Sequence, residues 1–390
     1  MNRLISLFVL VEAIVVLGFQ LFGLNVLWSF AQTSDGILSL AVIIGTTSIF
    51  RALSSLVRGY IVDSFQKKTT ILASLCVCGF LCIAWIFVQT YLVIAVVAYI
   101  TITLAQEVYE GSYTALVAEK LGQNDYIRYD SISIMSGRVV AVAGNLLSAI
   151  LIIFLPTEAI VISVTAILAL GVFVCQKFLP KSNIETKDEK PKFIWSFAKE
   201  NVFGSKKVII FIVIVFMLNL DYAFIPTLLP LYIITAAELA SPLLFGIIRA
   251  SNNIGEFVAS GVVLRYSHLV SRLVKIGLAG SAAVFVLLPF VYTFPIIVVL
   301  VFAVYSFFDM LTQPLYSYFV SSLAADKRGR ILGIVDSVIL MASPFGILLG
   351  GLLSGLGMVA VSIGIVTVFA VSLVIVASSK SFGKIALDKS

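Results

Sequence analysis

Long apolar stretches alternate with short polar breaks along almost the whole chain. A helix of about 20 apolar residues crosses roughly 30 Å of hydrocarbon, and the alternation predicts twelve such helices, near residues 4–28, 36–57, 70–88, 91–117, 131–154, 158–176, 208–234, 241–264, 276–291, 294–323, 331–354 and 357–378. The pattern therefore predicts an all-α integral membrane protein.

Composition supports this class and excludes a soluble globule. The chain is 61% hydrophobic and 12% charged, with a mean hydropathy of +1.12, whereas soluble domains carry about 25% charged residues. The first apolar stretch has features of a cleaved signal, because Arg3 precedes it and Ser29-Phe30-Ala31 resembles a cleavage site. Its length of about 25 residues exceeds the 7–15 of a signal core, which favours a retained first helix.

Basic residues occupy every second polar break. Of the 26 Lys and Arg residues, all but Arg51, Arg138 and Arg249 lie in these breaks or at the termini. The intervening breaks carry no base, and they lie near Gln32, Thr90, Pro156, Glu238, Thr293 and Leu356. Because basic loops stay in the cytoplasm, both termini are expected to be cytoplasmic. Anionic membrane lipid beside these loops accounts for the net charge of +6 without a nucleic acid partner.

The longest polar interval divides the predicted helices into six and six. We place an N-terminal six-helix bundle at 1–180, a cytoplasmic linker at 181–206, and a C-terminal bundle with a short tail at 207–390. Phe193, Ile194, Phe197 and Val202 have the near-helical spacing of a short amphipathic helix on the inner leaflet, with a plain solvated linker as the alternative.

An offset of 202 residues superimposes similar residues of the two halves. It pairs Gly59 with Gly261, Glu107 with Asp309, Arg128 with Arg330, and Gly144 with Gly346. Internal repeats related by an axis along the membrane normal are typical of one class of transporters. The offset therefore indicates two pseudo-symmetric bundles.

A distinctive order of residues follows the second apolar stretch. Gly59 is followed four residues later by Asp63 and then by the paired bases Lys67 and Lys68. A glycine lets helices approach closely, an aspartate can cap a neighbouring helix, and the bases can pair with acids that close the cytoplasmic side. An ordinary basic loop explains the bases, but it does not explain the glycine and the aspartate at this spacing.

This segment resembles the loop signature of the major facilitator superfamily, and the likeness extends over nearly the whole chain. The residues at 326–330 (DKRGR), followed by Pro344 and Gly346, look like the branch that contains bacterial macrolide and multidrug efflux permeases. The resemblance implies two six-helix bundles that alternate access. It assigns conformational gating to Gly59, Asp63, Lys67, Lys68, Arg128, Gly329 and Arg330.

Three departures from the family pattern leave two points open. These are whether this segment closes the cytoplasmic side, and in which direction the substrate moves. Ser64 and Gln66 replace a base and the second glycine of the loop signature. The antiporter signature of helix 5 is reduced to Gly144-Asn145 with Ser148 and Ala149. Glu107 stands where drug antiporters often carry an arginine, so a proton relay built on that arginine is not expected.

Six acidic residues fall inside predicted membrane helices, where an ionisable group costs about 2.5–3.5 kcal/mol. They are Glu12, Glu107, Glu110, Asp221, Glu256 and Asp309. In the resembled family helices 1, 4, 7 and 10 line the central cavity, and five of the six acids fall on them. The resemblance therefore implies an acidic cavity.

Neighbours of these acids complete the candidate site. Glu107 and Glu110 share a helical face, and repulsion between like charges favours a proton on one of them. Tyr305 adds an aromatic face to Asp309 that suits an organic cation, although packing and solvation are the alternative. Helix 8 contributes Arg249, Asn253 and Glu256. Arg138 requires a carboxylate, for which Glu107 and Glu110 are candidates, and a purely structural ion pair is the alternative.

Together these features predict a proton-coupled permease of the bacterial cytoplasmic membrane that exports an amphipathic or cationic small molecule or peptide. Its partners would be substrate, protons and membrane lipid. A nutrient importer or uniporter of the same fold is the nearest alternative, and a membrane-embedded enzyme or lipid-handling protein is a more distant one. The sequence has no Walker loop, GxSxG elbow or HExxH motif, so no enzyme activity, metal or cofactor is expected.

Overall fold

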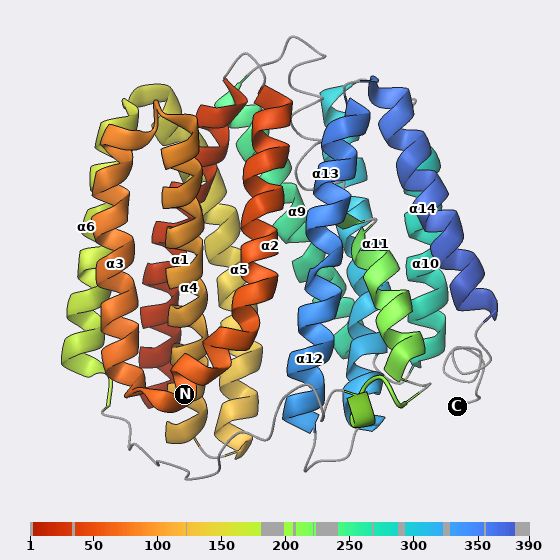
Figure 1. The fold of residues 1–390 in the computed structure, drawn as a ribbon, viewed down its shortest axis with the longest axis horizontal. Coiled ribbons are helices and arrows are strands. Elements are labelled where there is room, and N and C mark those ends of the chain that lie inside the picture. The colour runs from red at the N-terminus through yellow and green to blue at the C-terminus, as the bar shows by residue number, and fades with distance from the viewer. Residues whose placement is uncertain are drawn as a thin grey trace. The chain divides into compact units, whose positions relative to one another are not determined.

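The computed structural model describes residues 3–32, 36–121, 123–180, 199–205, 208–220, 222–223, 241–266, 269–287, 293–322, 328–354 and 356–378. Within these ranges the regular elements are helices (Figure 1). Seven of the described helices are long and apolar enough to cross a membrane, and Val42–Ser54, Val208–Leu220 and Val359–Val371 are shorter apolar helices. The all-α membrane class is confirmed, while the count of twelve and the cytoplasmic termini stay predictions.

The chain forms two compact units. Unit 1 comprises Met1–Ser34, Leu53–Asp188 and Pro242–Ala250, and unit 2 comprises Asp35–Ala52, Glu189–Ser241 and Ser251–Ser390. Each unit thus contains segments from both halves of the sequence. The division at 180 and 207 stays a prediction.

Five helices lie wholly in unit 1 and run alongside one another in Figure 1. They are α1 (Arg3–Ala31), α3 (Lys67–Val88), α4 (Leu92–Lys120), α5 (Gln123–Phe154) and α6 (Thr157–Phe178). α1 packs on α5 and α6, and α3 packs on α4 and α6. Trp85 of α3 is fully buried and meets Phe22 of α1 edge-on, with ring centroids 5.6 Å apart. These apolar and aromatic contacts hold α1 in the bundle.

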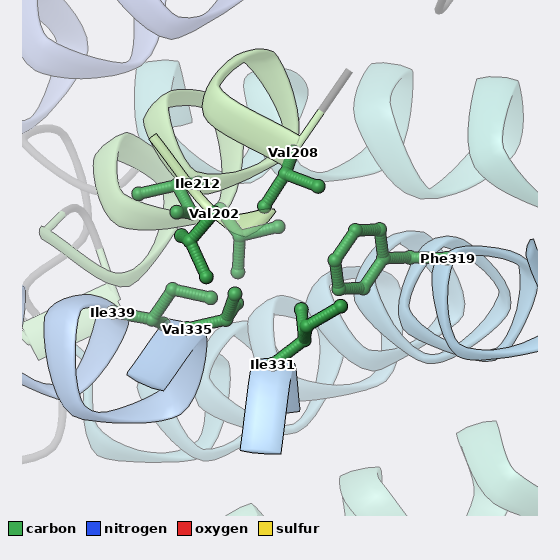
Figure 2. Close-up of a cluster of buried hydrophobic side chains, with 8 residues drawn as sticks. Val202, Val208, Ile212, Phe319, Ile331, Val335 and Ile339 are labelled. Atoms are coloured by element: carbon green, nitrogen blue, oxygen red, sulfur yellow. The ribbon is translucent and has the colours of Figure 1, made fainter. Parts of the chain in front are cut away.

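Among the described residues, five labelled helices and the helix Val208–Leu220 lie wholly in unit 2. The labelled helices are α10 (Val270–Leu287), α11 (Phe294–Ser322), α12 (Arg328–Leu340), α13 (Ala342–Ser354) and α14 (Met358–Ser378). α10 packs on α11 and α14. One buried cluster joins Val208–Leu220 to α11 and α12, and it contains Val202, Val208, Ile212, Val215, Phe319, Ile331, Val335 and Ile339 (Figure 2).

Val202, at the end of the predicted linker, is buried. Its side chain is 0% exposed and packs inside this cluster, while the amphipathic helix stays a prediction. The other expected positions of the amphipathic helix, Phe193, Ile194 and Phe197, lie outside the described residues.

Two helices are shared between the units. α2 (Gly36–Ser64) belongs to unit 2 through Ala52 and to unit 1 from Leu53, and α9 (Pro242–Arg265) changes unit after Ala250. In unit 1 a Cβ on Gly246 of α9 would lie 2.5 Å from the Cβ of Ala149 on α5. Glycine therefore permits this close crossing, which a larger residue would prevent.

One predicted helix boundary was wrong, and the predicted helix 331–354, which covers the candidate span Ile334–Leu353, contains a break. α2 continues to Ser64, because no proline stops it and apolar residues follow Gly59, so only Phe65 and Gln66 separate it from α3. Gly59 and Asp63 therefore lie in a helix and not in a loop. The predicted helix 331–354 is interrupted at Met341, since Pro344 cannot donate a hydrogen bond to the Leu340 carbonyl in a continuous helix.

Candidate functional site

In unit 1, hydroxyl groups of α5 hold the half-buried carboxylate of Glu12 on α1. The hydroxyl groups of Tyr129 and Ser133 donate hydrogen bonds to Glu12 Oε2, at 2.7 Å and 2.6 Å. Phe8, one turn before Glu12, meets the Tyr129 ring edge-on at 6.2 Å between centroids. α1 and α5 pack along their lengths, so the two hydroxyls reach the carboxylate from a fixed neighbour.

The second acid of unit 1 forms an ion pair. Arg58 Nη1 on α2 lies 2.6 Å from Glu107 Oε2 on α4. Glu107 is buried, whereas Glu110 is exposed and accepts a 2.8 Å hydrogen bond from Gln106. Arg58 was not predicted as a partner of Glu107, and the pairing of Arg138 with Glu107 or Glu110 stays a prediction. Arg138 itself lies on α5 and is half-buried.

In unit 2, a tyrosine binds the buried Glu256 of α9. The Tyr222 hydroxyl donates a 2.8 Å hydrogen bond to Glu256 Oε1. The ring of Tyr222 stacks on Phe308 at 4.4 Å and meets Tyr305 edge-on at 5.0 Å. Tyr305 is 1% exposed, so in this structure its ring packs against Tyr222.

A polar chain connects α11 to α9. Gln313 Nε2 donates hydrogen bonds to Asp309 Oδ2 and to Ser260 Oγ, each at 3.0 Å. The Ser260 hydroxyl donates in turn to the Glu256 carbonyl at 2.9 Å. This chain links the Asp309 carboxylate to the backbone of Glu256 and does not reach the Glu256 carboxylate. Arg249 and Asn253 lie on the same helix as Glu256 and are half-buried.

Both bases of the loop signature contact partners within unit 1. Lys67 Nζ lies 2.9 Å from Glu119 Oε2 on α4, and Lys120 binds the other oxygen of that carboxylate at 2.8 Å. Lys68 donates hydrogen bonds to the carbonyls of Gln176 and Leu179 at the end of α6. The two lysines fasten α3 to its neighbours, and their role in gating stays a prediction.

Some predicted site residues cannot be placed to the same detail. Asp221 lies outside the described residues. The helical backbone positions of Gly59, Asp63, Arg128, Gly329 and Arg330 are described, in α2, α5 and α12, without their side chains. Within the described part of the chain, no group of three His, Cys, Asp or Glu residues is arranged to hold a metal ion.

The family model described as "Major Facilitator Superfamily" matches residues 8–339. The chain belongs to this superfamily. This membership confirms the family suggested by the loop signature, while the efflux branch remains a proposal. A comparison with curated proteins gives no match.

Solved transporters of similar fold agree with major facilitator membership. The nucleoside transporter NupG superimposes with a TM-score of 0.72 at 14% identity, covering 100% of each chain. A mutant of NupG gives 0.73 at 15% identity, covering 97% of this chain and 99% of that one. The human organic anion transporter MFSD10 gives 0.70 at 16% identity, covering 96% and 99%. Together with the family match, the shared fold indicates a secondary transporter of small molecules and not an enzyme.

Two charged residues of this major facilitator protein that form side-chain contacts were not predicted from the sequence. Arg58 was assigned to a basic loop because α2 was predicted to end near residue 57. Asp336 of α12 was also overlooked. It lies between the apolar residues Val335 and Val338, and an acid in an apolar stretch is the feature by which the other acids were recognised. The Tyr316 hydroxyl donates to both oxygens of Asp336, at 2.9 Å and 3.1 Å.

Proposed function

We propose that this transporter exports an amphipathic organic cation or peptide in exchange for protons across the bacterial cytoplasmic membrane. In this proposal it has twelve transmembrane helices, both termini in the cytoplasm, and an alternating-access cycle. Glu12 receives the cationic group of the substrate. Glu107, with Glu110, Asp221 and Asp309 as further candidates, carries the coupling proton.

The surroundings of Glu12 are the main support for a cationic substrate. Among the described residues, two neutral hydroxyls donate hydrogen bonds to this carboxylate, and both reach the same oxygen, Oε2. A carboxylate has about four acceptor sites, so these two bonds leave acceptor capacity on the half-buried group. Hydroxyl donors orient the carboxylate without neutralising its charge, and a cation can therefore bind there.

The Arg58–Glu107 pair supports a different role for the second acid. A bound proton on Glu107 removes the charge that attracts Arg58, so protonation weakens the contact between α4 and α2. This coupling of a proton to a contact between two helices is what an alternating-access antiporter requires. We therefore assign cation recognition to Glu12 and proton coupling to Glu107.

The function is tested by ethidium efflux from cells that express the full-length protein. We expect these cells to accumulate less ethidium than cells with empty vector, and an uncoupler to remove the difference. Uridine uptake, measured in parallel, is expected to be unchanged. Protein-dependent uridine uptake without ethidium efflux would contradict export and favour a nutrient importer.

Glu12→Gln is expected to lower ethidium efflux about tenfold at equal protein level. The amide keeps the shape of the side chain but loses its charge, and a hydrogen bond to a charged group contributes about 1.5–3 kcal/mol. Glu158→Gln is the matched control, because Glu158 is exposed in the first turn of α6. An equal loss in both variants, or none in Glu12→Gln, would contradict cation binding by Glu12.

A further inference from the structure

Two neighbouring segments of unit 2 adjoin a weakened position of the helical backbone. α11 is continuous through Pro314, but Pro314 cannot donate a hydrogen bond to the Met310 carbonyl. A helix break lies at Met341, between α12 and α13, which follow one another end to end in Figure 1. Missing backbone hydrogen bonds make such positions the points where helices bend. Side-chain contacts therefore help to position the segment after Pro314 and α12.

A polar contact joins these segments. Tyr316, two residues after Pro314, donates its hydroxyl to both oxygens of Asp336, five residues before Met341. Both side chains are half-buried. The phenol and the carboxylate thus connect α11 to α12 between Pro314 and Met341.

Apolar packing surrounds this contact. Phe211 stacks on Phe319 with ring centroids 3.8 Å apart and an interplanar angle of 6°, and it lies tilted against Tyr316 at 6.3 Å. Phe319 belongs to the buried cluster that also contains Ile331 and Val335 of α12 (Figure 2). Val202 is part of the same cluster, so the end of the linker is packed against these segments.

The Asp336 carboxylate can fix the position of one helix on another, which apolar packing alone does not do. Hydrophobic contacts are non-directional and tolerate sliding between surfaces, whereas the Tyr316 hydroxyl fixes the register of α11 on α12. An acid within an apolar helix is costly and points to a functional role.

We propose that Tyr316 and Asp336 are positioning residues that fasten the segment of α11 after Pro314 to α12, so that the two segments move as one block during transport. The joints of this block are Pro314 and Met341. The linker end at Val202 moves with the block because it belongs to the same cluster. This role does not depend on the substrate or on the coupling ion.

Hydrogen–deuterium exchange of the full-length protein in lipid nanodiscs tests the proposal without a substrate. Tyr316→Phe and Asp336→Asn are each expected to increase exchange about tenfold in peptides from 315–322 and 328–340. Peptides from α10 and α14 are expected to be unchanged. The double variant should match the single ones, because both remove the same contact.

Tyr266→Phe is the matched control, since Tyr266 is an exposed phenol at the end of α9. Unchanged exchange in 328–340, or additive effects in the double variant, would overturn the proposal. A uniform increase over all helices would also overturn it, because it would indicate a general loss of stability and not the release of one block. Tyr316→Phe removes one oxygen atom only, and it decides the question if Asp336→Asn does not fold.

Discussion

Arg58→Met is expected to destabilise the protein by about 2–3 kcal/mol, and Glu107→Gln by about 1 kcal/mol, although the two residues form one ion pair. The two losses of stability differ because the side chains differ in exposure: the Glu107 side chain is 9% exposed and the Arg58 side chain is 35% exposed. Loss of Arg58 leaves a buried carboxylate without this cation. Loss of Glu107 leaves an arginine that solvent already reaches, and solvent screening reduces that cost.

The free energy of unfolding in mixed micelles measures this asymmetry. The double variant is expected to lose less stability than the two single variants combined, because removing both partners leaves no isolated charge. Lys120→Met is the control, since Lys120 pairs with Glu119 where both side chains are more than 20% exposed. It should change stability by less than about 0.5 kcal/mol. A larger loss for Glu107→Gln than for Arg58→Met would contradict the idea that the burial of Glu107 sets the cost of losing its partner.

Gly277→Ala and Gly261→Ala are expected to change stability in opposite directions. A Cβ on Gly277 of α10 would lie 2.6 Å from the Phe307 carbonyl oxygen and 2.8 Å from the Leu311 nitrogen of α11. These are backbone atoms, so the helices must separate, and overpacking of this kind costs about 1–3 kcal/mol. We expect a net loss of about 2 kcal/mol for Gly277→Ala.

Gly261→Ala provides the comparison within the same unit. No atom lies within 4 Å of a Cβ built on Gly261, so the substitution adds only helix propensity, about 1 kcal/mol at most. Thermal unfolding in detergent should give a lower midpoint for Gly277→Ala and an equal or higher one for Gly261→Ala. Equal midpoints above that of the unaltered protein would show that α10 and α11 tolerate separation.

The apolar pattern was sufficient to predict helices, because a membrane span must satisfy its backbone hydrogen bonds internally. The apolar pattern could not predict where helices end, because a helix end depends on a few local residues and not on overall hydrophobicity. α2 passes through Gly59 to Ser64 because nothing in that segment blocks its hydrogen bonds. The interruption at Met341 follows from Pro344, which sequence analysis noted only as part of a family signature.

Acids at the candidate site could be found from sequence, but their partners could not. A carboxylate in an apolar stretch is conspicuous because burial is costly. Its partner depends on how two distant helices are rotated about their axes. Arg58 lies 49 residues from Glu107, and Tyr129 lies 117 residues from Glu12. No periodicity within a single helix contains that information.

The sharing of α2 and α9 between the compact units has a consequence for the order of synthesis. Unit 1 includes Pro242–Ala250, where Gly246 packs against α5. This unit therefore cannot be completed when α6 leaves the ribosome, and it waits until more than half of the chain has been made. Unit 2 in turn takes the first part of α2, whose Gly45 contacts Leu348. One of the earliest segments to be inserted thus finds its partner among the last.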